Sequence, residues 1–226
     1  ERIIFADGKI SGVLSARGQI NFKQSDADVI YDYGSVPLPP YIKRDPEEID
    51  KIYYQTVYAK NEGALASPTA GLHFTSESLV EINKFGINLA YLTLHVGLGT
   101  FRPVKCTDIT EHKMEPEYFS VPDATIAAVT KAKNDAARVI AVGTTSLRAL
   151  ETYSLEKKEG NTDLFIYPGY KFKVVDCLLT NFHLPRTTLF MLVCAFGGKE
   201  LIFKAYQEAI EKKYRFYSYG DAMLII

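Results

Sequence analysis

The chain opens with short apolar runs separated by turn-forming residues. The runs are Ile3-Ile4-Phe5, Val13-Leu14, Ile20-Asn21-Phe22 and Val29-Ile30-Tyr31, and the breaks are Asp7-Gly8, Gly12 and Arg17-Gly18. This pattern is typical of small antiparallel strands, so we expect each run to be a strand. Prolines 37, 39 and 40 then fix an extended connector. We therefore expect a small subdomain over residues 1–35 and a main domain over residues 36–226.

Helical and strand patterns alternate after this connector. We expect a helix at 45–54, where Asp45 would be the N-cap, Pro46 would lie in the first turn and Glu48 would complete a capping box. Further helices are expected at 75–85, after Pro122, from about 145, from 187 and at 199–214, and strands at 87–94, 138–142, 172–179 and 222–226. Such alternation predicts a layered α/β fold with a largely parallel or mixed sheet.

A glycine-containing polar loop, residues 95–103, follows the apolar run 87–94, which we interpret as a buried strand. Gly97 and Gly99 let backbone amides approach a ligand, while His95, Thr100 and Arg102 offer an acid/base group, a hydroxyl and a cation. Glycines after a strand also make tight turns, so this loop alone supports either interpretation.

Three other polar loops have a similar character, at residues 67–74, 143–148 and 180–186. Loops that follow the carboxyl ends of strands in an α/β sheet converge on one crevice, so these loops can share a pocket. Gly143-Thr144-Thr145 follows an expected strand and opens a helix, where free amides and the helix dipole favour an anion. Arg148, one turn in, adds a cation. An ordinary N-cap is the alternative.

The histidines His73, His95, His112 and His183 all lie in or beside polar loops. Their spacing matches no zinc or iron pattern, so we expect no metal. Acid/base or hydrogen-bonding roles fit better, with a purely structural hydrogen bond as the alternative. The charged run 111–117 is either a solvated loop or, if it folds over the crevice, a source of a base in Glu111 or Glu117.

Composition restricts these functions only weakly. A net charge of −1 means that any nucleic-acid contact must come from a local basic patch. Three cysteines without paired metal or disulfide spacing favour a reducing compartment, so we expect a cytoplasmic protein. The longest apolar stretch, 188–196, is too short to span a membrane.

The chain begins at Glu1 in a strand-like segment, and we expect that its N-terminus is incomplete.

The polar loops together are more specific than any one of them. Segments 66–74, 95–104, 111–114, 141–148, 165–170, 180–185 and 214–226, extended by 37–43 and 54–58, resemble the S-adenosylmethionine:tRNA ribosyltransferase-isomerase family of queuosine biosynthesis. The resemblance runs in order from Val36 onward. The chain departs from the family pattern at Glu115, Asn161 and Arg186, where the family commonly has His, Trp and Lys.

This resemblance implies an enzyme that transfers and isomerises the ribosyl part of S-adenosylmethionine onto 7-aminomethyl-7-deazaguanine at the wobble position of a tRNA. Epoxyqueuosine, adenine and methionine would be the products. It also implies an α/β domain carrying a small antiparallel β-barrel, with residues 1 to about 33 as the tail of that barrel and part of the barrel missing. S-adenosylmethionine would serve as co-substrate, with no metal or redox cofactor. We expect a monomer that contacts the tRNA anticodon arm and no membrane.

Such a reaction needs a base at the 5′ carbon beside the sulfonium and a donor that assists departure of adenine. We expect His95 and His183 to fill these roles, with His73 and Glu111 behind them. The expected S-adenosylmethionine contacts are Gly97, Gly99, Thr100, Phe101, Gly143, Thr144 and Thr145, and the expected phosphate or carboxylate contacts are Arg102, Arg148, Arg186 and Asn181.

Two other classes of protein remain open from sequence. A nucleotide-binding α/β hydrolase that uses the histidines would bind metal and lose activity with a chelator. An RNA-binding module would bind tRNA without affinity for S-adenosylmethionine.

Overall fold

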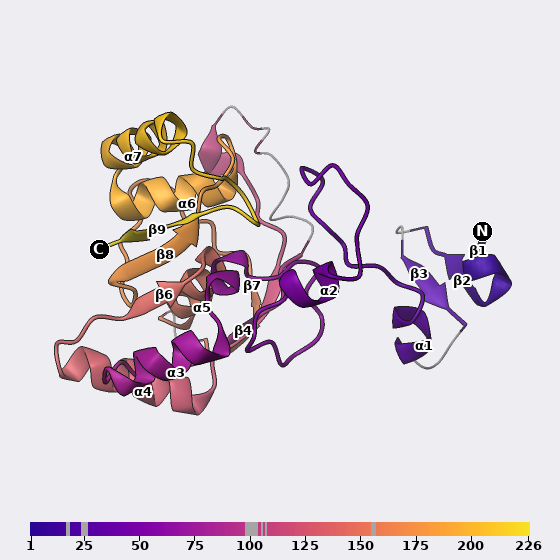
Figure 1. Cartoon of the computed structure of the whole chain (residues 1–226), viewed down its shortest axis with the longest axis horizontal. Helices are drawn as coiled ribbons and strands as arrows, with labels where there is room; N and C mark the ends of the chain where they lie inside the picture. Colours follow the sequence, from indigo (N-terminus) through magenta and orange to yellow (C-terminus); the bar gives the residue numbers. More distant parts are fainter. Residues whose placement is uncertain (17–18, 24–26, 98–103, 105, 107, 155–156) are drawn as a thin grey trace. The chain divides into compact units, whose positions relative to one another are not determined.

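The computed structural model of the chain describes residues 1–226 except 17–18, 24–26, 98–103, 105, 107 and 155–156 (Figure 1). The chain divides into two compact units. The small unit holds Glu1–Leu38 and Arg44–Pro46, and the main unit holds Pro39–Lys43 and Glu47–Ile226. None of the helices in the described part of the chain is long and apolar enough to cross a membrane.

The small unit is built on an antiparallel sheet of β1 (Arg2–Phe5), β2 (Ile10–Leu14) and β3 (Ile20–Phe22), in that order. A 3-10 turn η1 (Ala6–Gly8) joins the first two strands, with positive φ at Asp7 and Gly8. Three of the predicted strands are thus confirmed. The fourth is wrong, because Val29–Tyr31 lie in helix α1 (Ala27–Tyr31). Three apolar residues are too few to show a period of two or of 3.6.

Helices of the main unit follow the predicted pattern after residue 70. They are α3 (Ser76–Lys84), α4 (Asp123–Asn134), α5 (Thr144–Tyr153), α6 (Thr188–Gly197) and α7 (Lys199–Glu211), with the 3-10 turns η2 (Thr69–His73) and η4 (Ile109–Glu111). Thr75 caps α3 in a capping box with Ser78, and the Thr187 hydroxyl accepts from the Phe190 amide to cap α6. These caps explain why the starts of both helices could be predicted.

The helix expected at 45–54 is shorter than predicted. Helix α2 spans Asp50–Tyr53. The carboxylate of Asp50 accepts a hydrogen bond from the Glu47 amide at 2.8 Å, so Asp50 supports the preceding turn where Asp45 was expected to cap the helix.

Strands of the main unit form two three-stranded sheets. The first orders β4 (Thr93–Leu94), β5 (Glu117–Ser120) and β7 (Glu159–Thr162), all antiparallel. In the second, β6 (Ile140–Val142) runs parallel to β8 (Cys177–Asn181), and β9 (Ala222–Ile225) runs antiparallel to β8. The mixed α/β class is confirmed, whereas the layering and the barrel remain predictions.

Two predicted strands differ from the structure. Only residues 93–94 of the expected buried strand 87–94 pair with another strand, and Ile87 is 50% exposed. The strand expected at 172–179 begins at Cys177. Strands β5 and β7 were not predicted, since β7 has no large apolar residue and β5 has only Tyr118 and Phe119.

The core of the main unit joins both sheets to α5, α6 and α7, and it includes the fully buried Phe119, Leu147, Leu178 and Val193. Figure 1 shows α6 and α7 side by side. Helix α5 also carries a fully buried carboxylate, Glu151, which accepts hydrogen bonds from the backbone amides of residues 173, 174 and 175 at 2.9, 3.0 and 3.0 Å. These contacts fix α5 inside the core.

Candidate active site

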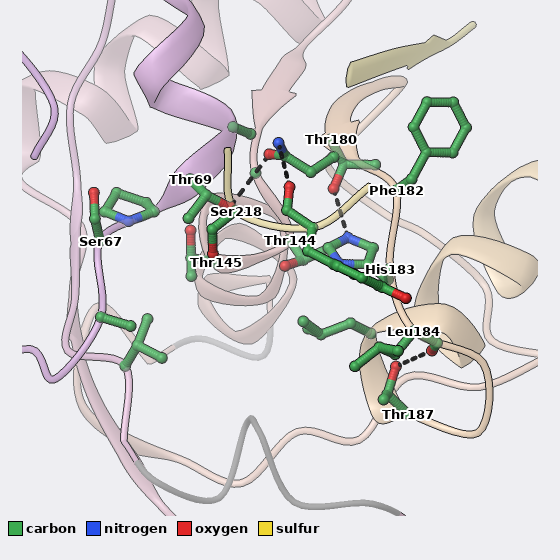
Figure 2. Close-up of a pocket in the computed structure, with 18 of the residues that line it drawn as sticks. Ser67, Thr69, Thr144, Thr145, Thr180, Phe182, His183, Leu184, Thr187 and Ser218 are labelled. Carbon is green, nitrogen blue, oxygen red and sulfur yellow. Dashed lines mark hydrogen bonds between the residues drawn. The ribbon is translucent and has the colours of Figure 1, made fainter. Parts of the chain in front are cut away.

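A pocket of about 370 Å³ lies in the main unit where the parallel strands β6 and β8 end side by side (Figure 2). This volume suits a small-molecule ligand. The lining comes from residues 40–41, 66–70, 143–145, 180–184 and 217–218, with Val96, Thr187 and Leu189. The structure therefore brings the predicted loops at 67–74, 143–148 and 180–186 together.

The first turn of α5 supplies polar groups to this pocket. Its N-cap is Gly143, with φ 89° and ψ 148°, and no side chain in the described part of the chain caps it. A Cβ at this position would lie 3.1 Å from the Thr145 hydroxyl. The first-turn amides of a helix have no partner within the helix, and its dipole favours negative charge. Thr144 and Thr145 thus stand where a carboxylate or hydroxyl-rich ligand can be held.

His183 lies half-buried in the pocket wall. Its Nε2 atom is 2.8 Å from the Thr180 hydroxyl, as Figure 2 shows, and its backbone amide donates to the Tyr206 hydroxyl at 2.8 Å. Burial of the ring lowers the pKa of His183 to about 4. The imidazole is therefore neutral near pH 7, a state that can accept a proton or form a hydrogen bond.

Asn181 connects three walls of the pocket. It is 2% exposed, and its Oδ1 accepts from the Thr69 hydroxyl at 3.2 Å. Its Nδ2 lies 3.1 Å from the carbonyl oxygen of Tyr217 and 3.3 Å from Nε2 of His73. The amide thus ties η2 and the loop at 217 to the end of β8. Contact of Asn181 with a substrate phosphate or carboxylate remains a prediction.

The other predicted acid/base residues lie outside the described lining. The ring of His95 stacks on Tyr118, with centroids 5.5 Å apart, and a Cβ added at Gly63 would lie 3.0 Å from it. Its neighbour Val96 does line the pocket. His73 is exposed and connects to the pocket through Asn181, and Glu111 is exposed in η4.

Arg148 and Gly97 meet at a buried carboxylate. Glu117 accepts a hydrogen bond from the Gly97 amide at 2.8 Å through Oε1 and pairs with the Arg148 guanidinium through Oε2. Arg148 also donates from Nε to the carbonyl of Leu164 at 3.2 Å. Arg148 is 3% exposed, so its charge faces protein groups and lies outside the lining. Sequence had suggested Glu117 as a base, but its two oxygens hold this arrangement.

Arg186 lies between the lining residues Leu184 and Thr187 and has a left-handed backbone, with φ 62°. Its carbonyl accepts from the Val104 amide at 3.3 Å. The predicted contacts Gly99, Thr100, Phe101 and Arg102 lie outside the described residues.

Sequence reasoning assigned no site role to Tyr217, whereas Tyr41 was among the aromatic residues that could stack on a base. The Tyr41 hydroxyl is 2.6 Å from that of Ser218, and the ring of Tyr41 packs against Tyr217. The available signal is segment 214–226, which belongs to the resemblance but has no pattern that assigns a role to Tyr217. Within the described parts of the chain, no three His, Cys, Asp or Glu side chains cluster as metal ligands would. The expectation of a metal-free reaction remains a prediction.

Comparisons with known proteins converge on one family. A family model described as "Queuosine biosynthesis protein" matches residues 1–225. The chain is 61% identical to an S-adenosylmethionine:tRNA ribosyltransferase-isomerase of Sulfurihydrogenibium sp., over 86% of this chain and 58% of that protein. It is 57% identical to a protein of the same name from Aquifex aeolicus, over 88% of this chain and 59% of that protein. The chain thus spans less than two thirds of either relative.

A solved structure gives the same likeness. The crystal structure of S-adenosylmethionine tRNA ribosyltransferase from Thermotoga maritima matches with a TM-score of 0.58 and 33% identity. The match covers 100% of this chain and 65% of that one.

Proposed function

The chain belongs to the queuosine biosynthesis protein family, and on that premise we propose that it transfers and isomerises the ribosyl part of S-adenosylmethionine onto a tRNA base. The acceptor is 7-aminomethyl-7-deazaguanine at the wobble position, and the products are epoxyqueuosine-tRNA, adenine and methionine. The names of the relatives, which identify S-adenosylmethionine:tRNA ribosyltransferase-isomerases, support this assignment.

The observation that carries the proposal is the uncapped first turn of α5 in the wall of the pocket. S-adenosylmethionine has an α-carboxylate, ribose hydroxyls and a flat base. The first-turn amides and the hydroxyls of Thr144 and Thr145 match the carboxylate or the ribose. Apolar lining from Ala66, Val96 and Leu189 suits the rest of the ligand.

His183 is the proposed base for the 5′ carbon. The sulfonium acidifies that carbon, and the imidazole of His183 lies in the pocket wall, where a ring nitrogen can accept its proton. His95, His73 and Glu111 remain weaker candidates, because their side chains lie outside the described lining. The proposal has four further parts. The protein binds tRNA through the anticodon arm, is a monomer and is located in the cytoplasm. Its small unit is part of a β-barrel.

The test is release of adenine. The 226-residue chain is incubated with S-adenosylmethionine and tRNA that carries the aminomethyl deazaguanine, and adenine and modified tRNA are quantified by chromatography. We expect equal amounts of the two products, unchanged by a chelator. The Aquifex aeolicus relative serves as positive control.

The outcomes separate the competing functions. Adenine from the relative and none from the chain would contradict the proposed activity of this chain. Loss of turnover with the chelator would favour the hydrolase reading, and tRNA binding without S-adenosylmethionine binding would favour an RNA-binding module.

A further inference from the structure

The segment from Arg215 to Asp221, which we call the aromatic loop, is closed by hydrogen bonds between its own ends. The Arg215 amide donates to Asp221 Oδ2 at 2.7 Å, and the Asp221 amide donates to the Arg215 carbonyl at 2.8 Å. The Arg215 guanidinium adds a third bond, to Asp221 Oδ1, at 2.7 Å. A Cβ at Gly220 would lie 2.5 Å from the Arg215 carbonyl oxygen, so this closure requires glycine there. The loop is therefore shaped by contacts of the protein itself.

Within this loop, Tyr217 has a left-handed backbone, with φ 72°. A bulky residue rarely takes this conformation, and it persists only where the surroundings determine it. The Tyr217 amide donates to the Phe182 carbonyl at 3.0 Å, and its carbonyl accepts from Asn181 Nδ2 and from the Gly220 amide, both at 3.1 Å. Hydrogen bonds to both polar backbone groups thus hold the unusual conformation.

The consequence of this backbone is the position of the tyrosine ring. The rings of Tyr217 and Tyr41 lie 5.0 Å apart with an interplanar angle of 42°, and both residues line the pocket. The neighbouring aromatic residues turn elsewhere. Phe216 packs on Phe182 in the core at 4.9 Å, and the Tyr219 hydroxyl donates to Asp50 at 2.7 Å.

We propose that Tyr217, backed by Tyr41, stacks on the adenine ring of S-adenosylmethionine. This inference rests on the proposed function and adds a specific subsite to it. Aromatic side chains bind nucleobases through their faces, and two tyrosines at one pocket wall provide such a surface. The first turn of α5 then meets the polar end of the ligand.

The test is isothermal titration of S-adenosylmethionine and, separately, adenosine into the chain without tRNA. Tyr217→Leu removes the ring, and we expect the Kd of both ligands to rise by the same factor, roughly 5- to 150-fold. Tyr217→Gly removes the ring while suiting the positive φ, so it should show the same loss without loss of folding. Tyr217→Phe should stay near the wild-type Kd. Tyr53→Leu removes an exposed ring from α2 and is the matched control.

Each result decides a different point. Wild-type binding with equal binding by Tyr217→Leu and Tyr217→Gly would overturn this inference and leave the proposed function standing. Weaker binding of S-adenosylmethionine with unchanged binding of adenosine would also overturn it, because the ring would then act on the sulfonium or methionine part. No binding of S-adenosylmethionine by the wild-type chain would remove both the proposed site and this inference.

Discussion

Glu117 of β5 and Arg148 of α5 form a buried ion pair, and the same carboxylate accepts the amide hydrogen of Gly97 at 2.8 Å. Arg148 lies one turn beyond the pocket-lining end of α5, and Gly97 follows the lining residue Val96. The pair therefore connects two walls of the pocket through groups that do not line it.

Removing one partner of this pair should be costly. Glu117→Leu leaves the Arg148 guanidinium buried without its carboxylate, and we expect the free energy of unfolding to fall by about 3–5 kcal/mol. The double variant Glu117→Leu/Arg148→Met removes both charges and should recover most of that loss. Urea unfolding of the wild type, Glu117→Leu, Arg148→Met and the double variant measures the coupling. A double variant as unstable as Glu117→Leu would show that the pairing is not the source of the cost.

The same double variant separates stability from binding. It lacks the carboxylate that holds Gly97, so its affinity for S-adenosylmethionine should stay below that of the wild type although its stability returns. Titration calorimetry measures this affinity. Full recovery of binding would mean that the Gly97 anchor does not matter for the ligand.

His183 should make stability depend on pH in a defined direction. Its pKa is about 4 in the native protein and 6.5 ordinarily, so the unfolded chain binds more protons between these pH values. The contribution of the neutral His183 to the free energy of unfolding is therefore complete above about pH 6.5 and is lost as the pH falls toward 4. Urea unfolding of wild type and His183→Gln at several pH values should show the wild type losing stability relative to the variant over this range. A constant difference would contradict the shifted pKa.

The two leading histidines should differ in turnover. His183→Gln should lower kcat about 10²–10⁴-fold, the range for loss of a general acid or base. Its Kd for S-adenosylmethionine should change little. His95→Gln should lower kcat less, since His95 stacks on Tyr118 outside the described lining. Rapid-quench measurement of adenine formation compares them, and an unchanged kcat in His183→Gln would remove His183 from the mechanism.

Gly143 should be sensitive to a single methyl group. Alanine there must adopt a φ of 89° and a ψ of 148°, a region almost restricted to glycine, at a cost of about 1–3 kcal/mol. We expect weaker binding of S-adenosylmethionine as well, since the first turn of α5 would shift. Gly198 is the matched control, because it is the N-cap of α7 with a φ of 80° and a ψ of 135°. Gly198→Ala should lose similar stability in thermal unfolding and keep its affinity for the ligand.

Much of the fold could be predicted because several helices carry their own start signals, as Thr75 and Thr187 show. Strands were harder. The apolar run 87–94 has the composition of a buried strand, yet Ile87 is half exposed, because burial depends on partners distant in sequence. Strand β5 was missed for the opposite reason, since its Glu117 is charged and is buried against Arg148 and the Gly97 amide.

The candidate site also has a part that could be predicted from the sequence and a part that could not. Gly143, Thr144, Thr145, Asn181 and His183 share one pocket, as expected when loops follow neighbouring parallel strands. The buried position of Arg148 in α5 depends on Glu117 in β5, and the lining role of Tyr217 depends on a left-handed backbone. Neither leaves a local pattern in the sequence.

Glu151 in α5 and the three amides of residues 173–175 that donate to it differ in how well they tolerate substitution. An amide hydrogen belongs to the backbone, so replacement of Lys173, Val174 or Val175 cannot delete a partner unless proline is introduced. The glutamate is different, because an apolar side chain at 151 would leave all three amides without their acceptor, two of them buried. Mutational tolerance is therefore unequal across one set of hydrogen bonds, because the acceptor depends on one side chain and the donors belong to the backbone.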